Sequence, residues 1–260
     1  MSFSLFIFER TDNLKTSQDV LEYMSEFTEY TENKDYNSLN GCSEIISKWA
    51  KRMFAKFPPI NGEDASPDAI ASAGKELELH LTDYSLGKNG AFCGFAWPVA
   101  EEALEYAISI LEEMGVGIYD PQDGKIYGKG IKCLKYRTDG REDSFGDWAE
   151  IEASVQTLDS TERGTSHREN AFITVWFEQD GQPEDDYIQC TPNYQKKSFV
   201  KTLFQRRKEN LISGYIFEIM KDDSLYQTQV TSKEELIILM KDWCLSRKEP
   251  DIGSYDKILL

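Results

Sequence analysis

Hydrophobic and polar positions in the first 130 residues predict alternating strands and helices. Residues 2–8, SFSLFIF, form a short continuous apolar run of the kind that is typical of a buried strand. Two helices are expected next, the second with Ser43 as its cap and Pro58-Pro59 after its end. The apolar stripes of these helices are Val20, Met24, Phe27 and Tyr30, and then Ile46, Trp49, Ala50, Met53 and Phe57.

The segment around residue 80 predicts a hairpin. Leu77, Leu79 and Leu81 alternate with the polar Glu78 and His80, which favours a half-buried strand. A turn at residues 87–90 would then return the chain as a second strand. In this interpretation His80 is an ordinary half-exposed strand residue.

A long helix is expected after this hairpin. Pro98 suits its first position and Gly115 suits its end. Strands should follow at residues 116–119 and 125–127. The order of strand, helix, helix, strand, strand, helix and strand is a split βαβ pattern with one extra helix. We therefore expect a ferredoxin-like sheet with its helices on one face.

The pattern restarts after residue 130. Glycines and charges accumulate at residues 127–140, and a new helix is expected from Ser144. This change in composition predicts a domain boundary. The predicted fold class is α+β with two domains, a ferredoxin-like domain at residues 1–130 and, at residues 131–260, an antiparallel sheet with flanking helices.

Two hairpins and a final helix complete the second half. Residues 172–190 and residues 215–230 each contain two apolar, strand-like runs around a turn. Ser232 and Glu235 have the spacing of a capping box, which predicts the start of the last helix.

Acidic side chains are expected at both hairpin turns. Glu184, Asp185 and Asp186 should lie at the tip of the first hairpin, and Asp222 and Asp223 at the turn of the second. Consecutive side chains diverge, and neither a histidine nor a further acid stands nearby to complete a metal shell. We therefore predict that these five residues bind a protein partner and not a metal. Ordinary solvated turns are the alternative.

The charge balance favours a basic partner. The chain has 29 Lys and Arg residues against 46 Asp and Glu residues, a formal net charge of −17. Such a field repels nucleic acid and anionic membranes and speeds encounter with a basic protein. Neither a nucleic-acid nor a membrane partner is therefore expected, although solubility alone also explains a large net charge.

Cysteine usage and hydropathy predict a cytoplasmic protein. The cysteines are odd in number, far apart and never in a CxxC pair, which indicates reduced thiols. The apolar run at the N-terminus is too short for a signal peptide, and no segment reaches the roughly 18 apolar residues of a membrane span. The five cysteines are Cys42, Cys93, Cys133, Cys190 and Cys244.

Motifs of known catalytic or cofactor chemistry are absent from the sequence. The two histidines, His80 and His167, have no ligand spacing, so no metal site is predicted. GxSxG, GxxxxGK[ST] and GxGxxG are all missing, so no cofactor is expected either. A Cys–His pair that meets only in the folded chain is the alternative that the sequence leaves open.

One basic stretch stands out in this acidic chain. KKSFVKTLFQRRK, residues 196–208, interleaves cations with Phe199 and Phe204 in a way that could contact nucleic acid. A solvated helix face is the preferred interpretation because the whole chain is strongly acidic. The cations of this candidate patch are Lys196, Lys197, Arg206, Arg207 and Lys208.

Each half of the chain resembles a bacterial family. The first half is similar to an uncharacterised bacterial α+β family through SFSLFIFE, KFPPI, FAWPVAEEAL and GVGIYDPQDG. The second half resembles the immunity proteins of polymorphic toxin systems, through an apolar strand before DDYIQC and then GYIFEI, LYQTQV and SKEELIILMKDW in this order. The resemblance implies a cytosolic, non-catalytic protein that binds and occludes a cognate toxin domain. It carries over no individual functional residue.

Two functions compete at this point. The first is an immunity protein without enzymatic activity that neutralises a basic toxin domain, such as a nuclease, by docking its acidic surface on the cationic site. The second is an enzyme with an unrecognised Cys or His site. An uncharacterised interaction protein of another kind is a third reading.

Overall fold

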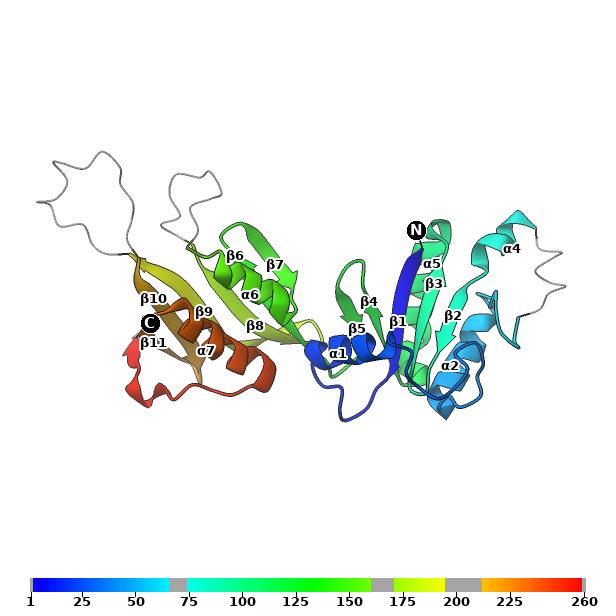
Figure 1. Cartoon of the computed structure of the whole chain (residues 1–260), viewed down its shortest axis with the longest axis horizontal. Helices are drawn as coiled ribbons and strands as arrows, with labels where there is room; N and C mark the ends of the chain where they lie inside the picture. Colours follow the sequence, from blue (N-terminus) through cyan, green and yellow to red (C-terminus); the bar gives the residue numbers. More distant parts are fainter. Residues whose placement is uncertain (1, 66–73, 160–170, 195–211, 259–260) are drawn as a thin grey trace, which may run out of the picture. The chain divides into compact units, whose positions relative to one another are not determined.

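The computed structural model describes residues 2–65, 74–159, 171–194 and 212–258. The chain divides into two compact units, Met1–Lys132 and Cys133–Leu260. Each unit has its own antiparallel sheet and its own apolar core (Figure 1). The predicted α+β class with two sheets is confirmed. In the described part of the chain, no helix is long and apolar enough to span a membrane.

The sheet of the first unit has the strand order β2-β3-β1-β4-β5. Its central strand β1 is antiparallel to both β3 and β4, and β2 is antiparallel to β3. This is the arrangement of a ferredoxin-like split βαβ unit, with β5 added at one edge. The strands are β1 (Phe3–Glu9), β2 (Asp83–Leu86), β3 (Gly90–Phe95), β4 (Val116–Asp120) and β5 (Lys125–Tyr127).

Helices cover both faces of this sheet, so the expectation of helices on one face is wrong. Leu5 and Ile7 of β1 belong to a core with α2 and α5. Phe6 points to the other face, where its ring lies 5.5 Å from that of Tyr23 and 5.4 Å from that of Phe27 on α1. The apolar run at residues 5–8 of β1 requires this arrangement, because successive side chains alternate between the two faces. The helices are α1 (Ser17–Phe27), α2 (Glu44–Phe54) and α5 (Ala100–Met114).

The ends of these helices follow the local signals in the sequence. Ser43 accepts a hydrogen bond from the Ile46 amide at 3.1 Å and caps α2. Trp97–Val99 forms the short helix η1 that leads into α5. Gly115 ends α5 with a φ of 72°, a left-handed conformation that favours glycine.

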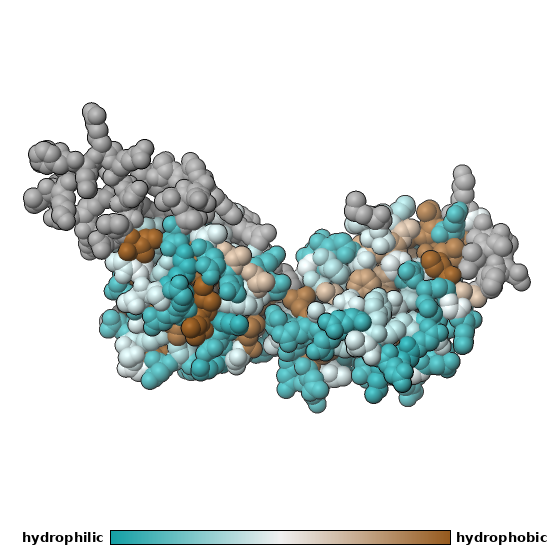
Figure 2. Space-filling view, viewed as in Figure 1, coloured by the Kyte–Doolittle hydropathy of each residue, from teal (hydrophilic) through white to brown (hydrophobic). Residues whose placement is uncertain are grey.

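The predicted strand at residues 77–81 is wrong. Lys75–His80 forms the short helix α4, and the first strand of the hairpin is β2. KELELH consists of good helix formers, whereas the following Tyr84 and Leu86 supply the buried positions of the strand. Leu77 and Leu79 stay 39% and 40% exposed, and Figure 2 shows apolar surface in the neighbourhood of α4.

The second sheet has the order β12-β11-β10-β9-β8-β6-β7. The segment at residues 127–140, where glycines and charges accumulate, contains strand structure, and only residues 128–131 separate β5 from β6. Ser144 lies in β7, so the next helix starts later than predicted, with Asp147 as its cap. The strands are β6 (Lys132–Thr138), β7 (Arg141–Phe145), β8 (Ile173–Gln179), β9 (Gln182–Tyr194), β10 (Ile212–Lys221), β11 (Ser224–Val230) and β12 (Asp256–Ile258).

Two helices, α6 (Trp148–Gln156) and α7 (Lys233–Ser246), pack on one face of this sheet (Figure 1). Ser232 caps α7 by accepting a hydrogen bond from the Glu235 amide at 3.1 Å. A short helix, η3 (Ile252–Ser254), follows α7. The core beneath the helices takes alternate residues of the central strands: Ile173, Val175 and Phe177 on β8, Ile188 and Cys190 on β9, and Tyr215, Phe217 and Ile219 on β10.

Candidate binding site at the acidic end of the second sheet

The acids of the first hairpin lie in a strand and not in the turn. The turn between β8 and β9 consists of Asp180 and Gly181, with φ values of 53° and 77°. These two left-handed residues make the type of tight turn that joins antiparallel strands. Glu184, Asp185 and Asp186 follow it within β9, which corrects the prediction that they form the hairpin tip.

A β-bulge positions these three acids. Trp176 pairs with Tyr187 and Glu178 pairs with Pro183, so the single Phe177 on β8 faces three consecutive residues on β9. Extra residues in one strand break the regular alternation and redirect side chains. The bulge therefore lets consecutive acids point in directions that a regular strand would not allow.

Glu184 is held by an intramolecular ion pair. Its Oε2 lies 2.8 Å from Nη2 of Arg247, the residue that ends α7 in a left-handed conformation. The Arg247 guanidinium also lies over the rings of Phe177, at 4.2 Å, and Trp243, at 5.1 Å. Glu184 thus fastens the end of α7 to the sheet, and the partner-binding role predicted for it stays a prediction.

The other acids come together from two hairpins. Asp222 and Asp223 are exposed and form the turn between β10 and β11, with φ values of 48° and 56°. Tyr187 pairs with Met220, which sets Asp186 beside Lys221 at the start of that turn. Asp185 is exposed next to them. We name the group Asp185, Asp186, Asp222 and Asp223 the acidic end.

The raised pKa of Lys221 reflects the grouping of these acids. Glu249 accepts a hydrogen bond from Lys221 and is the main reason that the pKa of Lys221 is raised. The charges of Asp222 and Asp186 raise it further, which is expected only where acids from both hairpins are close to one ammonium group. One lysine cannot neutralise four carboxylates together with Glu249, so the acidic end keeps a negative field.

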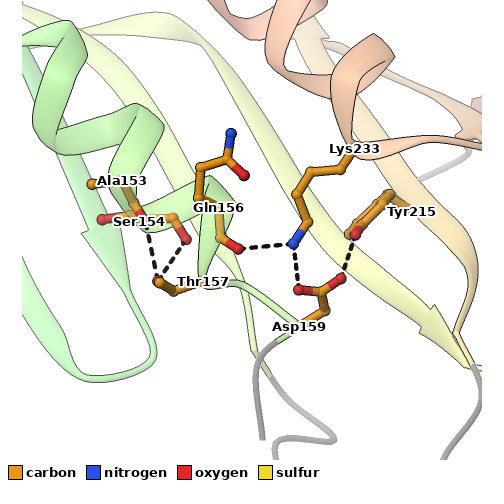
Figure 3. Close-up of polar contacts among 7 residues, drawn as sticks. All are labelled: Ala153, Ser154, Gln156, Thr157, Asp159, Tyr215 and Lys233. Atoms are coloured by element: carbon orange, nitrogen blue, oxygen red, sulfur yellow. Dashed lines mark hydrogen bonds and ion pairs between the residues drawn. The ribbon is translucent and has the colours of Figure 1, made fainter. Parts of the chain in front are cut away.

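A second polar cluster joins the two helices to the sheet (Figure 3). Asp159 follows α6, and its carboxylate accepts hydrogen bonds from Tyr215 Oη and Lys233 Nζ, each at 2.5 Å. Lys233 also donates to the carbonyl oxygen of Gln156 at 2.8 Å. Partial burial alone would raise the pKa of Asp159, but the bonds from Lys233 and Tyr215 outweigh it and lower the pKa.

This Asp159 cluster fits a structural role better than catalysis. Burial first, and then Asp159, raise the pKa of Tyr215 above its ordinary value, so the phenol keeps its proton at neutral pH. Lys233 is committed to Asp159 and Gln156, and the side chains of Lys233 and Asp159 are each only 21% exposed. The cluster fastens α6 and α7 to β10.

We expect Asp159→Asn to lower the free energy of unfolding by about 1–2 kcal/mol at pH 7, because a charged, hydrogen-bonded partner of Lys233 is lost. A carboxyl group with a lowered pKa stabilises the fold above its unfolded pKa and loses this effect as the pH falls. The difference between wild type and variant should therefore shrink below the ordinary Asp pKa of 3.8. Urea titrations of wild type and variant, from pH 7 down to below pH 3.8, measure this difference in the free energy of unfolding. The exposed Asp139→Asn is the control, and an equal loss in both variants would contradict the role of Asp159.

Four of the five thiols lack the surroundings of a nucleophile, whereas Cys42 Sγ accepts a hydrogen bond from Lys34 Nζ at 3.1 Å. Burial raises the pKa of Cys93, raises that of Cys133 to about 11 and raises that of Cys190 to about 12. Burial also raises the pKa of Cys244. Reactive cysteines have the opposite property, a lowered pKa in an electropositive and accessible setting. All five cysteines are free thiols.

His80 is part of the packing in the first unit. Its ring stacks on Phe57 with centroids 5.3 Å apart, and Nε2 lies 3.2 Å from Glu102 Oε2. It sits in α4 and not in a strand as predicted. His167 and the basic stretch at residues 196–208 lie outside the described residues. Within the described ranges, no group of three or more His, Cys, Asp or Glu residues could hold a metal ion.

Sequence reasoning missed two aromatic residues beside the acidic end. Trp176 and Tyr187 form a cross-strand pair on the face of the sheet opposite the helices, where they line an open hollow. The alternation in FITVWFEQ could have shown the position of Trp176, because Trp176 shares a face with the polar Thr174 and Glu178 while Ile173, Val175 and Phe177 form the apolar set. In comparisons with known proteins, no family model, no curated protein and no solved structure matches this chain.

Proposed function

We propose that this chain is a non-catalytic binding protein that neutralises a basic toxin domain by occlusion, in the manner of bacterial immunity proteins. The observation that carries the proposal is the convergence of Asp185 and Asp186 with Asp222 and Asp223 at one end of a sheet. Such acids attract a cationic surface, and a surface that binds a nucleic-acid substrate must be cationic.

The net charge supports the same function. At −17 for the whole chain, the long-range field favours encounter with a basic domain at every orientation, and a local acidic group then orients the complex. The backbone that carries the acidic end also favours binding. Its carboxylates stand on a bulge and on a tight turn between paired strands, so little conformational freedom is lost on binding.

Occlusion needs no chemistry from this chain. The cysteine thiols with raised pKa values and the internally bonded Asp159, Lys233 and Tyr215 are consistent with a protein that only binds. A toxin that acts on nucleic acid would be neutralised in the cytoplasm, which is therefore the proposed location.

The proposal is tested by capture followed by a growth assay. The tagged chain should retain a basic protein from its native host at low salt, and lose it as salt is raised. Expression of the retained domain alone should stop growth of a test bacterium, and co-expression of this chain should restore it. A retained protein that is harmless on its own, or toxicity that this chain does not relieve, would refute the proposal.

A further inference from the structure

The face of the second sheet opposite the helices carries an apolar row. Directly paired residues of antiparallel strands lie on the same face. The registers place Trp176, Tyr187, Met220 and Leu225 side by side across β8, β9, β10 and β11. None of these four residues belongs to the core beneath α6 and α7.

A polar row runs beside the apolar row. Thr174 Oγ1 donates to Gln189 Oε1 at 2.7 Å, and Gln189 Nε2 donates to Glu218 Oε2 at 3.0 Å. These bonds connect β8, β9 and β10 and hold the side chains in one orientation. The face is thus a prearranged surface on which aromatic rings adjoin fixed hydrogen-bonding groups.

An open hollow of about 450 Å³ lies on this face. Trp176 and Tyr187 line it together with Pro183, Thr174 and Gln189, and two charged residues, Glu184 and Arg137, also border it. Trp, Tyr and Arg are the residue types that most often dominate binding energy at protein interfaces. We name this site the aromatic hollow.

We propose that the aromatic hollow receives an arginine side chain of the basic partner, with the guanidinium stacked on Trp176 and Tyr187. This inference rests on the proposed function for the identity of the partner. It adds the anchor that surface charges alone do not supply, because exposed charges mainly raise the rate of encounter.

The molecule already uses the same chemistry on the other face of the bulge. There, Arg247 stacks on Phe177 and Trp243 and pairs with Glu184. Guanidinium groups suit such sites because they are planar, weakly hydrated and able to stack on rings while bonding a carboxylate.

Charge complementarity selects a basic occupant. The hollow adjoins the acidic end through Tyr187, which follows Asp186 directly in β9, and Glu218 stands in the neighbouring polar row. Arg137 borders the hollow from β6 on the side away from the acidic end. An incoming arginine should therefore approach from the acidic end.

A nona-arginine peptide serves as the probe, so that the test needs no identified partner. We expect it to shift the indole N–H resonance of Trp176 in NMR spectra, assigned with Trp176→Thr. We also expect Trp176→Thr and Tyr187→Thr to weaken peptide binding about 10-fold each. Threonine keeps strand propensity, and urea titration of each variant checks that the fold is intact. Nona-lysine should bind more weakly than nona-arginine.

Trp97→Thr is the matched control, because Trp97 is a 51% exposed tryptophan of the first unit. Equal peptide affinity of wild type and folded Trp176→Thr, or an equal loss in Trp97→Thr, would overturn the inference. The same comparison can be made with the captured basic protein in place of the peptide. If Trp176→Thr binds that protein as tightly as wild type does, the hollow is not the anchor, but the proposed function still holds. Peptide binding in the hollow without any captured toxin would support the hollow and refute the proposed function.

Discussion

Reversing the charge of the acidic end should slow association with the basic partner by about 10- to 100-fold at low salt. The change is Asp185, Asp186, Asp222 and Asp223 to Lys in one variant. Stopped-flow or surface-binding kinetics measure the association rate. The dissociation rate should change less, because these side chains stand at the rim of the surface and not at its centre.

The expected slowing of association comes from the position of the four acids and not only from the change in net charge. Carboxylates from two hairpins act together because the register of β9 on β10 brings Asp186 beside Lys221, whose pKa is also raised by Asp222. Their combined field falls off within about 8 Å at physiological salt, so the difference between wild type and variant should narrow as salt is added. Lys at the exposed Asp185 should change the free energy of unfolding by about 0.5 kcal/mol or less, whereas Lys at Asp222 and Asp223 must adopt a left-handed conformation and should cost about 1 kcal/mol each.

A control with equal charge change separates position from net charge. Asp12, Glu29, Glu105 and Glu113 are exposed residues of the first unit, and their replacement by Lys alters the formal charge by the same amount. The control should slow association only slightly. Equal slowing in both variants would mean that the acidic end has no special role, and an unchanged rate in both would remove electrostatic attraction from the proposal.

Gly214→Ala should destabilise the second unit by about 3 kcal/mol or more. Gly214 has a φ of 132°, which an L side chain rarely adopts, and it lies where the pairing of β9 with β10 shifts register. A Cβ atom at this position would lie 2.4 Å from the carbonyl oxygen of Val230 in the adjoining strand. Both the backbone conformation and the contact with β11 would have to change, and neither can do so without loss of strand hydrogen bonds.

Gly181→Ala isolates the conformational part of this cost. Gly181 also has a positive φ, 77°, but a Cβ atom there would meet nothing within 4 Å. We expect a loss of about 1 kcal/mol for this variant. Calorimetry measures the loss of stability in both variants. Hydrogen exchange of β10 and β11 shows whether the unfolding transition is that of the second unit. Equal losses in the two variants would show that the close approach of Val230 is not important.

The sequence predicted most of the helices and strands because their signals are local. Ser43 caps α2 and Gly115 ends α5 through contacts within a few residues, and such signals need no tertiary information. KELELH at α4 was predicted as a strand because six residues of alternating leucine and polar residues fit both a strand and a short helix. Only the packing of Tyr84 and Leu86 decides between the two.

The candidate site could be predicted only in part, because its decisive features are long-range. The acids are visible in the sequence, but the pairing of Glu184 with Arg247 joins residues 63 positions apart. The bulge opposite Phe177 depends on the register of two strands, which the sequence of either strand does not contain. In FITVWFEQ, Trp176 alternates with the polar Thr174 and Glu178, which favours the outer face for it, but its pairing with Tyr187 depends on the register of two strands.

Each sheet ends on one side in a strand of only three residues, β5 in the first unit and β12 in the second. Exposed strand edges are templates on which further copies of a chain can add, and long apolar edges lead to fibrils. Lys125 in β5 and Lys257 in β12 place a charge on each of these short edges. These two edges therefore offer little support for edge-to-edge aggregation.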